Sequence, residues 1–195
     1  MSLMLSMAAF ALAASISPGP VNIVALGAGA RHGLRASLAH VTGATLGFCL
    51  LLVLVGLGLH ELLRHWPGLA RLLQAGGVLF LFYMAWKLSS DNGELGAGNR
   101  EEPPSMLYGA TLQWLNPKAW LASVAGIGAY VGEGETSLLW QFTGLYFVIC
   151  YLSVASWAWA GSVISHYLNN PRRMRLFNRS LALLLVASAI YLLLG

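Results

Sequence analysis

The chain has 195 residues, of which 57% are hydrophobic and only 9% are charged. Soluble domains carry about 25% charged residues, so this composition excludes a soluble globular fold and indicates an integral membrane protein. The net charge of +4 comes from clustered Lys and Arg, which we interpret as a membrane-topology signal and not as a nucleic-acid-binding surface. Cys49 and Cys150 lie in apolar runs without metal-ligand spacing, so we expect two core residues, no metal site and no cofactor.

Apolar segments long enough to cross a bilayer follow one another along the chain, since a spanning helix needs about 20 mainly apolar residues. The first half holds the predicted segments 3–30, 36–59 and 69–88. The first of these is interrupted at residues 17–20, and a basic turn at residues 31–35 separates it from the second.

The second half holds the predicted segments 106–131, 138–164 and 176–194. Residues 89–105 lie between the halves and are rich in Gly, Ser, Asn and Pro. Such a composition is typical of a flexible linker, so we expect this stretch to be soluble.

The segments divide the chain into one three-helix repeat at residues 1–88 and a second at residues 106–195. Three spans per half give the halves opposite orientations, and one side then holds most of the basic residues: Arg31, Arg35, Lys87, Arg100, Arg172, Arg173, Arg175 and Arg179. The other side holds only Arg64 and Arg71. The positive-inside rule therefore predicts that both termini lie outside the cytoplasm.

Two helix breaks occupy matching positions in the two halves. Pro18, Gly19 and Pro20 interrupt the first segment, and Asn116-Pro117 interrupts the fourth. Proline removes a backbone N–H, and the carbonyls it frees persist in hydrocarbon only where they face protein or a wet cavity. Matched breaks are typical of a transport site. The predicted fold is an all-α integral membrane protein with six transmembrane helices in an inverted 3+3 repeat, the first and fourth helices broken at proline.

A broken helix exposes N–H groups at the start of one half-helix and carbonyls at the end of the other. The N–H groups attract a carboxylate and the carbonyls attract an ammonium, so the pair suits a zwitterion such as an amino acid. Asn22 and Asn116 lie at the breaks, and we expect both to contact the substrate. The alternative is that Pro18, Gly19, Pro20 and Pro117 only kink helices for packing, with the asparagines repairing the backbone.

Lys118 and His40 are the titratable candidates inside predicted spans. An intramembrane charge is a functional hypothesis by default, and Lys118 is expected to engage a substrate carboxylate or a counter-charge. The alternative for Lys118 is a side chain that reaches an interface. His40 is a candidate proton relay, and the alternative favoured on frequency is a neutral histidine that hydrogen-bonds across helices.

Other motifs point to packing and not to chemistry. No Ser-His-Asp spacing, phosphate-binding glycine loop or paired-carboxylate site is evident, so we do not expect an enzyme. Three small-residue pairs predict close helix packing and would also allow a homodimer: Gly29 with Gly33, Gly43 with Gly47, and Gly128 with Gly132.

Several motifs together resemble the lysine-exporter (LysE/RhtB) family of bacterial amino acid exporters. They are Ser17-Pro18-Gly19-Pro20, Arg31-His32-Gly33-Leu34-Arg35-Ala36, the Gly43/Gly47 segment ending in Gly56-Leu57-Gly58-Leu59, Gly76-Gly77 followed by Tyr83-Met84-Ala85-Trp86-Lys87, and Leu115-Asn116-Pro117-Lys118-Ala119. The likeness covers nearly the whole chain in the family's order. It implies a multi-pass exporter of amino acids in the bacterial inner membrane, driven by the proton or electrical gradient.

The chain departs from the family at Phe48, where several members carry an acid after the second glycine. This departure argues against a carboxylate proton carrier and leaves His40 or Lys118. The predicted function is secondary-active export of an amino acid or a related small zwitterion by alternating access. Two alternatives from the wider superfamily are a membrane thiol–disulfide conductor, which would need Cys49 and Cys150 to meet, and a divalent-metal exporter, which would need acids that these spans lack.

Overall fold

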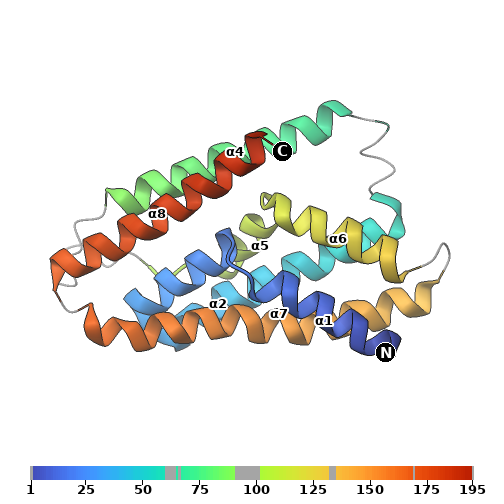
Figure 1. Ribbon diagram of the computed structural model, residues 1–195, viewed down its shortest axis with the longest axis horizontal. Coiled ribbons are helices and arrows are strands. Elements are labelled where there is room, and N and C mark those ends of the chain that lie inside the picture. Colours follow the sequence, from blue (N-terminus) through green and yellow to red (C-terminus); the bar gives the residue numbers. More distant parts are fainter. Residues whose placement is uncertain are drawn as a thin grey trace.

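The structure, a computed structural model, describes residues 2–59, 65, 67–90, 102–131, 135–168 and 170–194. Within these ranges every regular element is helical and no strand occurs, which confirms the predicted all-α class (Figure 1). The elements are α1 (Leu3–Ile16), α2 (Pro20–Leu54), the π-helical η1 (Val55–Leu59), α4 (Pro67–Ser89), α5 (Met106–Trp114), α6 (Pro117–Tyr130), α7 (Thr136–Ile164), the 3-10 turn η2 (Ser165–Tyr167) and α8 (Pro171–Leu194). Most of the predicted linker, residues 91–101, lies outside the described residues, as do Arg64 and Arg100.

Helix α2 reverses its direction at Gly33. This residue has a φ of 80° and a ψ of 167°, a conformation that glycine adopts without steric cost. The Nε2 atom of His40 lies 3.3 Å from the carbonyl oxygen of Val21, whereas a straight helix would separate the two residues by about 28 Å. α2 therefore consists of two antiparallel limbs, residues 20–32 and 34–54, and the predicted basic turn is confirmed.

Two of the described helices are long and apolar enough to cross a membrane, Pro20–Gly58 and Thr136–Tyr167. Leu3–Ile16 and Ala75–Ser89 are shorter apolar helices. Because the first long helix folds back at Gly33, only its second limb is a straight candidate span. Its first limb continues the course of α1 beyond the break.

Large apolar side chains lie exposed on many helices. Leu79, Leu121, Leu152 and Leu183, on four different helices, are each more than half exposed. Exposed apolar area on this scale marks a surface that contacts lipid or protein. The surface therefore suits the hydrocarbon of a bilayer.

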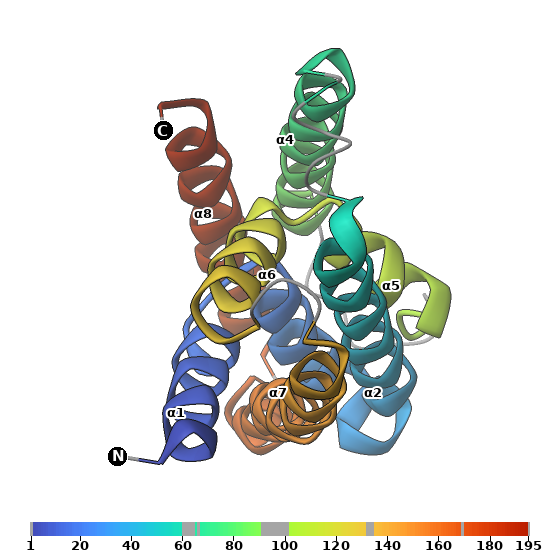
Figure 2. The same cartoon turned by 90° about the vertical axis from the view of Figure 1, so that its right-hand side faces the viewer.

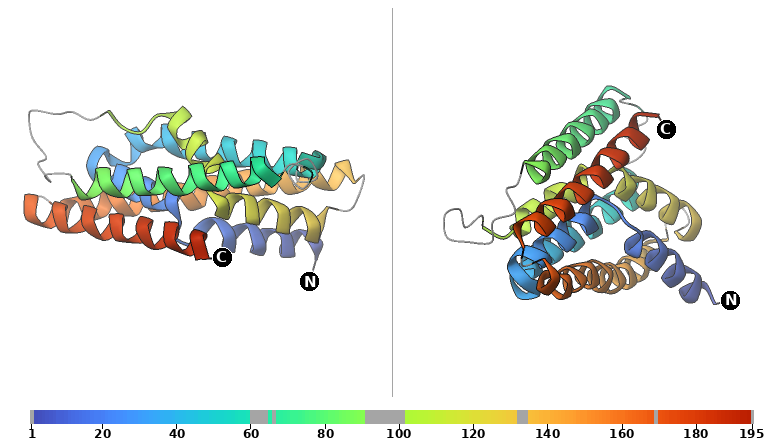
Figure 3. Two further views of the ribbon diagram at one scale, coloured as in Figure 1. Left: turned by 90° about the horizontal axis from the view of Figure 1, so that it is seen from above. Right: turned by 60° about the vertical axis from the view of Figure 1, so that its left-hand side comes forward.

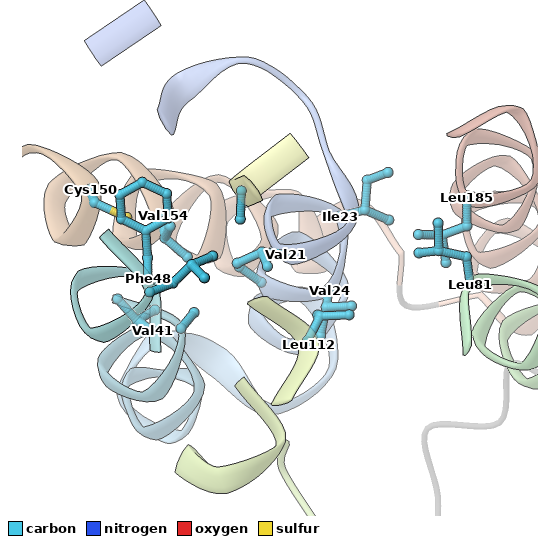
Figure 4. Packing of buried hydrophobic residues seen from close by; sticks show 14 of the residues in the cluster. Val21, Ile23, Val24, Val41, Phe48, Leu81, Leu112, Cys150, Val154 and Leu185 are labelled. Carbon is cyan, nitrogen blue, oxygen red and sulfur yellow. The ribbon is translucent and has the colours of Figure 1, made fainter. Parts of the chain in front are cut away.

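Two groups of helices build the molecule. α1, α2, α5, α6 and α7 pack together, whereas α4 and α8 form an antiparallel pair that stands to one side (Figures 2 and 3). Leu81 of α4 and Leu185 of α8 face each other within this pair (Figure 4). The first limb of α2 lies between the two groups, since Ile23 points toward the Leu81–Leu185 contact (Figure 4).

Glycine allows the first limb of α2 to approach the backbone of α7 closely. A Cβ atom on Gly29 would lie 1.9 Å from the carbonyl oxygen of Ala158, and one on Gly161 would lie 2.0 Å from that of Leu26. Neither position can hold a larger residue without moving a helix. The predicted close packing at Gly29 is confirmed within a single chain.

The other predicted glycine faces divide into two cases. Cβ atoms on Gly43 and Gly47 would collide with the backbone of α5, so this face is also covered within the chain. A Cβ on Gly128 would meet nothing within 4 Å. The face at Gly128 is therefore open to a second molecule, while its predicted partner Gly132 lies outside the described residues.

Most described basic residues gather at one end of the molecule. The Gly33 turn, the C-terminal end of α4 and the start of α8 all lie at this end, which is on the left in Figure 1. The N-terminus, the C-terminal end of α6 and the start of α7 lie at the opposite end. The two ends therefore differ in charge as the sequence predicts.

The predicted boundary of the last segment is wrong. We expected this segment to begin at residue 176, with the basic residues before it in a connection, but α8 already begins at Pro171. Pro171 has the backbone angle that a helix start needs, and the Asn170 side chain accepts a hydrogen bond of 2.8 Å from the Arg172 N–H. The arginines between residues 172 and 179 thus lie on the first turns of α8.

Candidate transport site

A small polar cavity lies where the two helix breaks meet. It has a volume of about 40 Å³, and residues of both breaks line it: Gly19, Asn22, Asn116 and Lys118. Its apolar wall includes Val21, Phe48, Cys150 and Val154, which gather from α2 and α7 in Figure 4. The structure therefore brings together the polar candidates that the sequence places almost a hundred positions apart.

Proline chemistry explains why both helices stop at this level. Ser17 adopts an extended conformation (φ −64°, ψ 141°), as a residue before proline prefers, so α1 ends at Ile16. Pro20 and Pro117 then stand at the first turns of α2 and α6, where a missing N–H costs nothing. Each break is thus an end and a new start, not a kink.

Side chains at the first break satisfy the carbonyls that α1 leaves open. The Ser17 hydroxyl donates to the carbonyl of Ala13 at 2.8 Å. The amide of Asn22 donates to the carbonyls of Ser15 at 2.8 Å and Ser17 at 2.9 Å. Asn22 therefore repairs the backbone, which is the structural role foreseen as the alternative to substrate contact.

A tryptophan from the other half of the chain completes this repair. The indole N–H of Trp157 on α7 donates to the carbonyl of Ile16 at 3.0 Å. The end of α1 thus has a partner for each carbonyl from Ala13 to Ser17, because the Ser17 hydroxyl also lies 3.3 Å from the carbonyl of Ala14. No open backbone carbonyl faces hydrocarbon at this end.

Lys118 crosses from the second break to the first. Its Nζ atom donates to the carbonyl of Ser17 at 2.7 Å and to the Ser17 hydroxyl at 2.8 Å, and it lies 3.4 Å from the carbonyl of Pro18. Its side chain passes Gly19, where a Cβ atom would lie 3.3 Å from Lys118 Cδ. The ammonium therefore sits among oxygens of the opposite half of the chain and does not reach toward an interface.

The second break is held by its own polar side chains. Asn116 caps α6, since its Oδ1 accepts from the N–H of Lys118 at 3.2 Å. Its Nδ2 donates to Oε1 of the buried Gln113 at 3.2 Å. The indole N–H of Trp120 donates to the carbonyl of Trp114 at 2.8 Å, which satisfies the end of α5.

The start of α2 lacks such a cap. Gly19 occupies the N-cap position and makes no side-chain hydrogen bond to the first turn. Gly19, Val21 and Asn22 all line the cavity, so this helix start faces it. A helix N-terminus carries a partial positive charge and favours an anion.

Polar groups missed by the sequence analysis also line the cavity. The hydroxyl of Ser15 is buried and makes no hydrogen bond, and Tyr146 and Gln113 complete the polar lining. Gln113 carries a weak signal, because a polar residue one turn before Asn116 is unusual in an apolar span. Ser15 and Tyr146 carry none, since only tertiary packing brings them to the breaks.

His40 lies away from the cavity lining. It is fully buried, its Nε2 faces the Val21 carbonyl, and its Nδ1 has no hydrogen-bond partner. The ring of Tyr108 lies 6.2 Å away. His40 thus joins the two limbs of α2 just behind the first break.

A larger cavity opens at the basic end of the molecule. It has a volume of about 330 Å³, and apolar residues of α2 and α4 share its lining with Arg31, Lys87, Glu102 and Asn178. A cavity of about 150 Å³ holds benzene, so this one has room for an amino acid, whereas the central cavity does not.

An aromatic cluster packs between α1, α6 and α7. The ring centroids of Tyr130 and Phe142 lie 5.4 Å apart, and those of Phe10 and Tyr130 lie 5.7 Å apart. The hydroxyl of Tyr130 is 3.0 Å from that of Ser6. α1, α6 and α7 are therefore joined on the side of the N-terminus.

Comparisons with known proteins relate the chain to membrane exporters. The "Cysteine/O-acetylserine efflux protein" of Escherichia coli (strain K12) is 28% identical over 184 residues, which cover 93% of this chain and 92% of that protein. The protein of the same name from Salmonella typhimurium (strain LT2) is 27% identical over the same shares. No solved structure matches the chain. The family described as "LysE type translocator" matches residues 12–195, so the chain belongs to this family of membrane transporters and not to a family of enzymes.

Proposed function

We propose that the protein is a secondary-active exporter of amino acids or related small zwitterions in the bacterial inner membrane. The observation that carries the proposal is the cavity that residues of both helix breaks line together. The family and the efflux function named for its relatives support the direction of transport. The driving force is the proton gradient or the membrane potential, acting through alternating access.

The proposed architecture is six spans in an inverted 3+3 repeat, with repeats at residues 1–88 and 106–195. In this scheme α1 and the first limb of α2 correspond to α5 and α6. Proline stands at the first turn of the second half-helix in both cases, which supports the correspondence. The basic end is the cytoplasmic side by the positive-inside rule.

The site binds a zwitterion by its two charged ends. The uncapped start of α2 and Lys118 attract the carboxylate, and the oxygens around the end of α1 attract the ammonium. Pro18, Gly19, Pro20 and Pro117 open the backbone for these contacts. Asn22 and Asn116 hold the two breaks at the distance that the substrate needs, and their amides border the same cavity.

The first candidate substrates are cysteine and O-acetylserine, the molecules named for the relatives. Both are small and carry no net charge at neutral pH. The apolar wall of Val21, Phe48 and Val154 leaves no counter-charge for a charged side chain. The cavity at the basic end is the cytoplasmic entrance through which such a molecule arrives.

His40 is the proposed proton relay. It is buried beside the carbonyl of Val21, in the first turn of the broken helix. A proton on Nδ1 would place a charge there and would favour a rearrangement of the two limbs of α2. The His40→Gln variant is expected to keep substrate exchange and to lose acceleration of transport by a pH gradient. Equal acceleration in the variant and the wild type would exclude the relay.

The thiol–disulfide alternative depends on Cys49 and Cys150, which are both free and buried. Cys150 lines the central cavity, whereas Cys49 is not among its lining residues. Among the described residues no group of three or more His, Cys, Asp or Glu side chains could hold a metal ion.

Counterflow in proteoliposomes tests the proposed function. Vesicles are loaded with an unlabelled amino acid pool, and uptake of labelled cysteine, O-acetylserine and other neutral amino acids is followed with and without a pH step. Saturable exchange of one or a few of them supports an amino acid exporter. Exchange of none of them, followed by none of other small polar metabolites, would refute the transporter assignment.

A further inference from the structure

The ammonium of Lys118 occupies a set of oxygens that could hold any primary ammonium group. The Ser17 carbonyl, the Ser17 hydroxyl and the Pro18 carbonyl lie 2.7, 2.8 and 3.4 Å from Nζ. A charged donor with oxygen partners at these distances makes strong, charge-assisted hydrogen bonds. Lys118, whose ammonium these oxygens hold, lines the central cavity together with Gly19 and the buried Ser15.

The position of Lys118 on its own helix is unfavourable for a cation. It is the second residue of α6, close to the positive end of that helix. Its ammonium is stabilised by the negative end of a different helix, α1, across the cavity. The ammonium of Lys118 is therefore stabilised by the first break, although the backbone of this residue is part of the second break.

The backbone at the end of α1 does not need Lys118. The carbonyl of Ser17 already accepts a hydrogen bond from Asn22, and the four preceding carbonyls have the partners described above. After departure of the ammonium, the Ser17 carbonyl keeps Asn22 as its donor and the Ser17 hydroxyl keeps its hydrogen bond to Ala13, whereas the Pro18 carbonyl loses its contact with Lys118. Lys118 is thus an additional ligand that can leave while the helix end stays satisfied.

We infer that the oxygens of Ser17 and Pro18 form the subsite for the ammonium of the exported molecule, and that Lys118 occupies this subsite in the empty transporter. The inference rests on the proposed function. When substrate arrives, its ammonium replaces that of Lys118, and the released Lys118 pairs with the substrate carboxylate at the start of α2. One cation replaces another, so the subsite is never left empty.

The size of the central cavity agrees with this exchange. At about 40 Å³ it is too small for an amino acid while Lys118 lies across it. Release of the ammonium from the Ser17 and Pro18 oxygens frees the space that it fills next to the cavity. Substrate binding and release of Lys118 are therefore coupled by space as well as by charge.

Exchange and net efflux separate this role from a simple carboxylate contact. Exchange requires only that the substrate-loaded transporter changes between its two orientations. Net efflux also requires the empty transporter to change back. Without Lys118 the empty form returns with an unfilled cation subsite, which is unfavourable in a low-dielectric interior. We therefore expect Lys118→Met to lose net efflux by about tenfold or more, the equivalent of one charge-assisted hydrogen bond, and to keep exchange.

Proteoliposomes loaded with labelled O-acetyl-L-serine are diluted into buffer with or without unlabelled O-acetyl-L-serine, which measures exchange and net efflux respectively. Leu121→Met on the lipid-exposed face of α6 is the matched control and should behave as wild type. Parallel loss of both activities with a higher half-saturating concentration would show that Lys118 is only a carboxylate ligand. Two unchanged activities would show that it is only a structural cap. Either result overturns the inference while exchange by the wild type leaves the proposed function intact.

A binding measurement tests the subsite without transport. Lys118→Ala vacates both the ammonium position and the space of the side chain, so n-propylammonium chloride should raise the Tm of the purified variant. It should leave the Tm of the wild type and of Leu121→Ala unchanged. Sodium propionate should not raise the Tm of Lys118→Ala. No rise in Tm for Lys118→Ala would overturn the ammonium subsite. This result is independent of whether the wild type transports an amino acid.

Discussion

The amide of Asn22 joins the two sides of the first helix break, because it donates to the carbonyls of Ser15 and Ser17 at 2.8 and 2.9 Å. Asn22 lies in the first turn of α2 and donates hydrogen bonds to carbonyls at the end of α1. A single side chain thereby sets the position of one helix end against the start of the next. The break is a rigid feature of the fold and not a loose hinge.

Replacement of Asn22 by Ala should therefore destabilise the protein. Two buried hydrogen bonds are lost and two carbonyls remain without that donor, which corresponds to about 2–3 kcal/mol. Thermal unfolding in detergent micelles measures the effect as a lower Tm. Gln141→Ala, which removes an exposed amide from α7, is the control and should leave Tm unchanged. Equal Tm values for the two variants would contradict the role of Asn22.

Trp157 offers a second test of the carbonyl partners of α1. Trp157→Phe keeps most of the ring and removes the N–H that donates to Ile16, so we expect a loss of about 1 kcal/mol. Trp159→Phe is the matched control, since that ring is 58% exposed on the same helix. Chemical denaturation of both variants compares the two losses. A larger loss for Trp159→Phe would be incompatible with the assigned hydrogen bond.

The contact between α2 and α7 should tolerate no Cβ atom. Gly161→Ala would place one 2.0 Å from the carbonyl oxygen of Leu26, so the helices must separate and lose packing. We expect a cost of about 1–3 kcal/mol or more, the range of overpacked cores. Gly128→Ala meets no atom within 4 Å and should not lower Tm. The yield of folded protein and the Tm in detergent distinguish the two variants.

The cysteines are expected to be dispensable for transport. A Cys49→Ala, Cys150→Ala variant keeps the hydrogen-bond partners of both helix breaks, since neither thiol takes part in those hydrogen bonds. Its counterflow rate should therefore stay within about threefold of the wild type, allowing for the small cavities left behind. Loss of all activity, together with a disulfide detected in the wild type by mass spectrometry, would revive the thiol–disulfide alternative.

The helix breaks could be predicted from sequence because proline acts locally. Pro18, Pro20 and Pro117 restrict their own and the preceding residue, so the ends of α1 and the starts of α2 and α6 follow from covalent chemistry. The reversal at Gly33 was also predictable, since the basic residues around it interrupt two apolar runs. The start of α8 was not, because the arginines were interpreted as a connection although Asn170 and Pro171 form a helix start.

The contacts that complete the site were beyond sequence reasoning. Trp157 lies 141 positions from Ile16, and no local pattern distinguishes it from the tryptophans that face lipid. The direction of Lys118 likewise depends on how the two halves meet. The sequence left open whether Lys118 engages a substrate, a counter-charge or an interface, and the fold places its ammonium at the end of α1.

The most direct test of the central claim is counterflow by Asn116→Ala, with Leu121→Ala as control. Asn116 caps α6 and holds Gln113 at the cavity, whereas Leu121 faces outward from the same helix. The account predicts that Asn116→Ala reconstitutes as a folded protein and loses saturable amino acid exchange, while Leu121→Ala exchanges at the wild-type rate. Wild-type exchange by Asn116→Ala would contradict the assignment of the transport site to the two helix breaks.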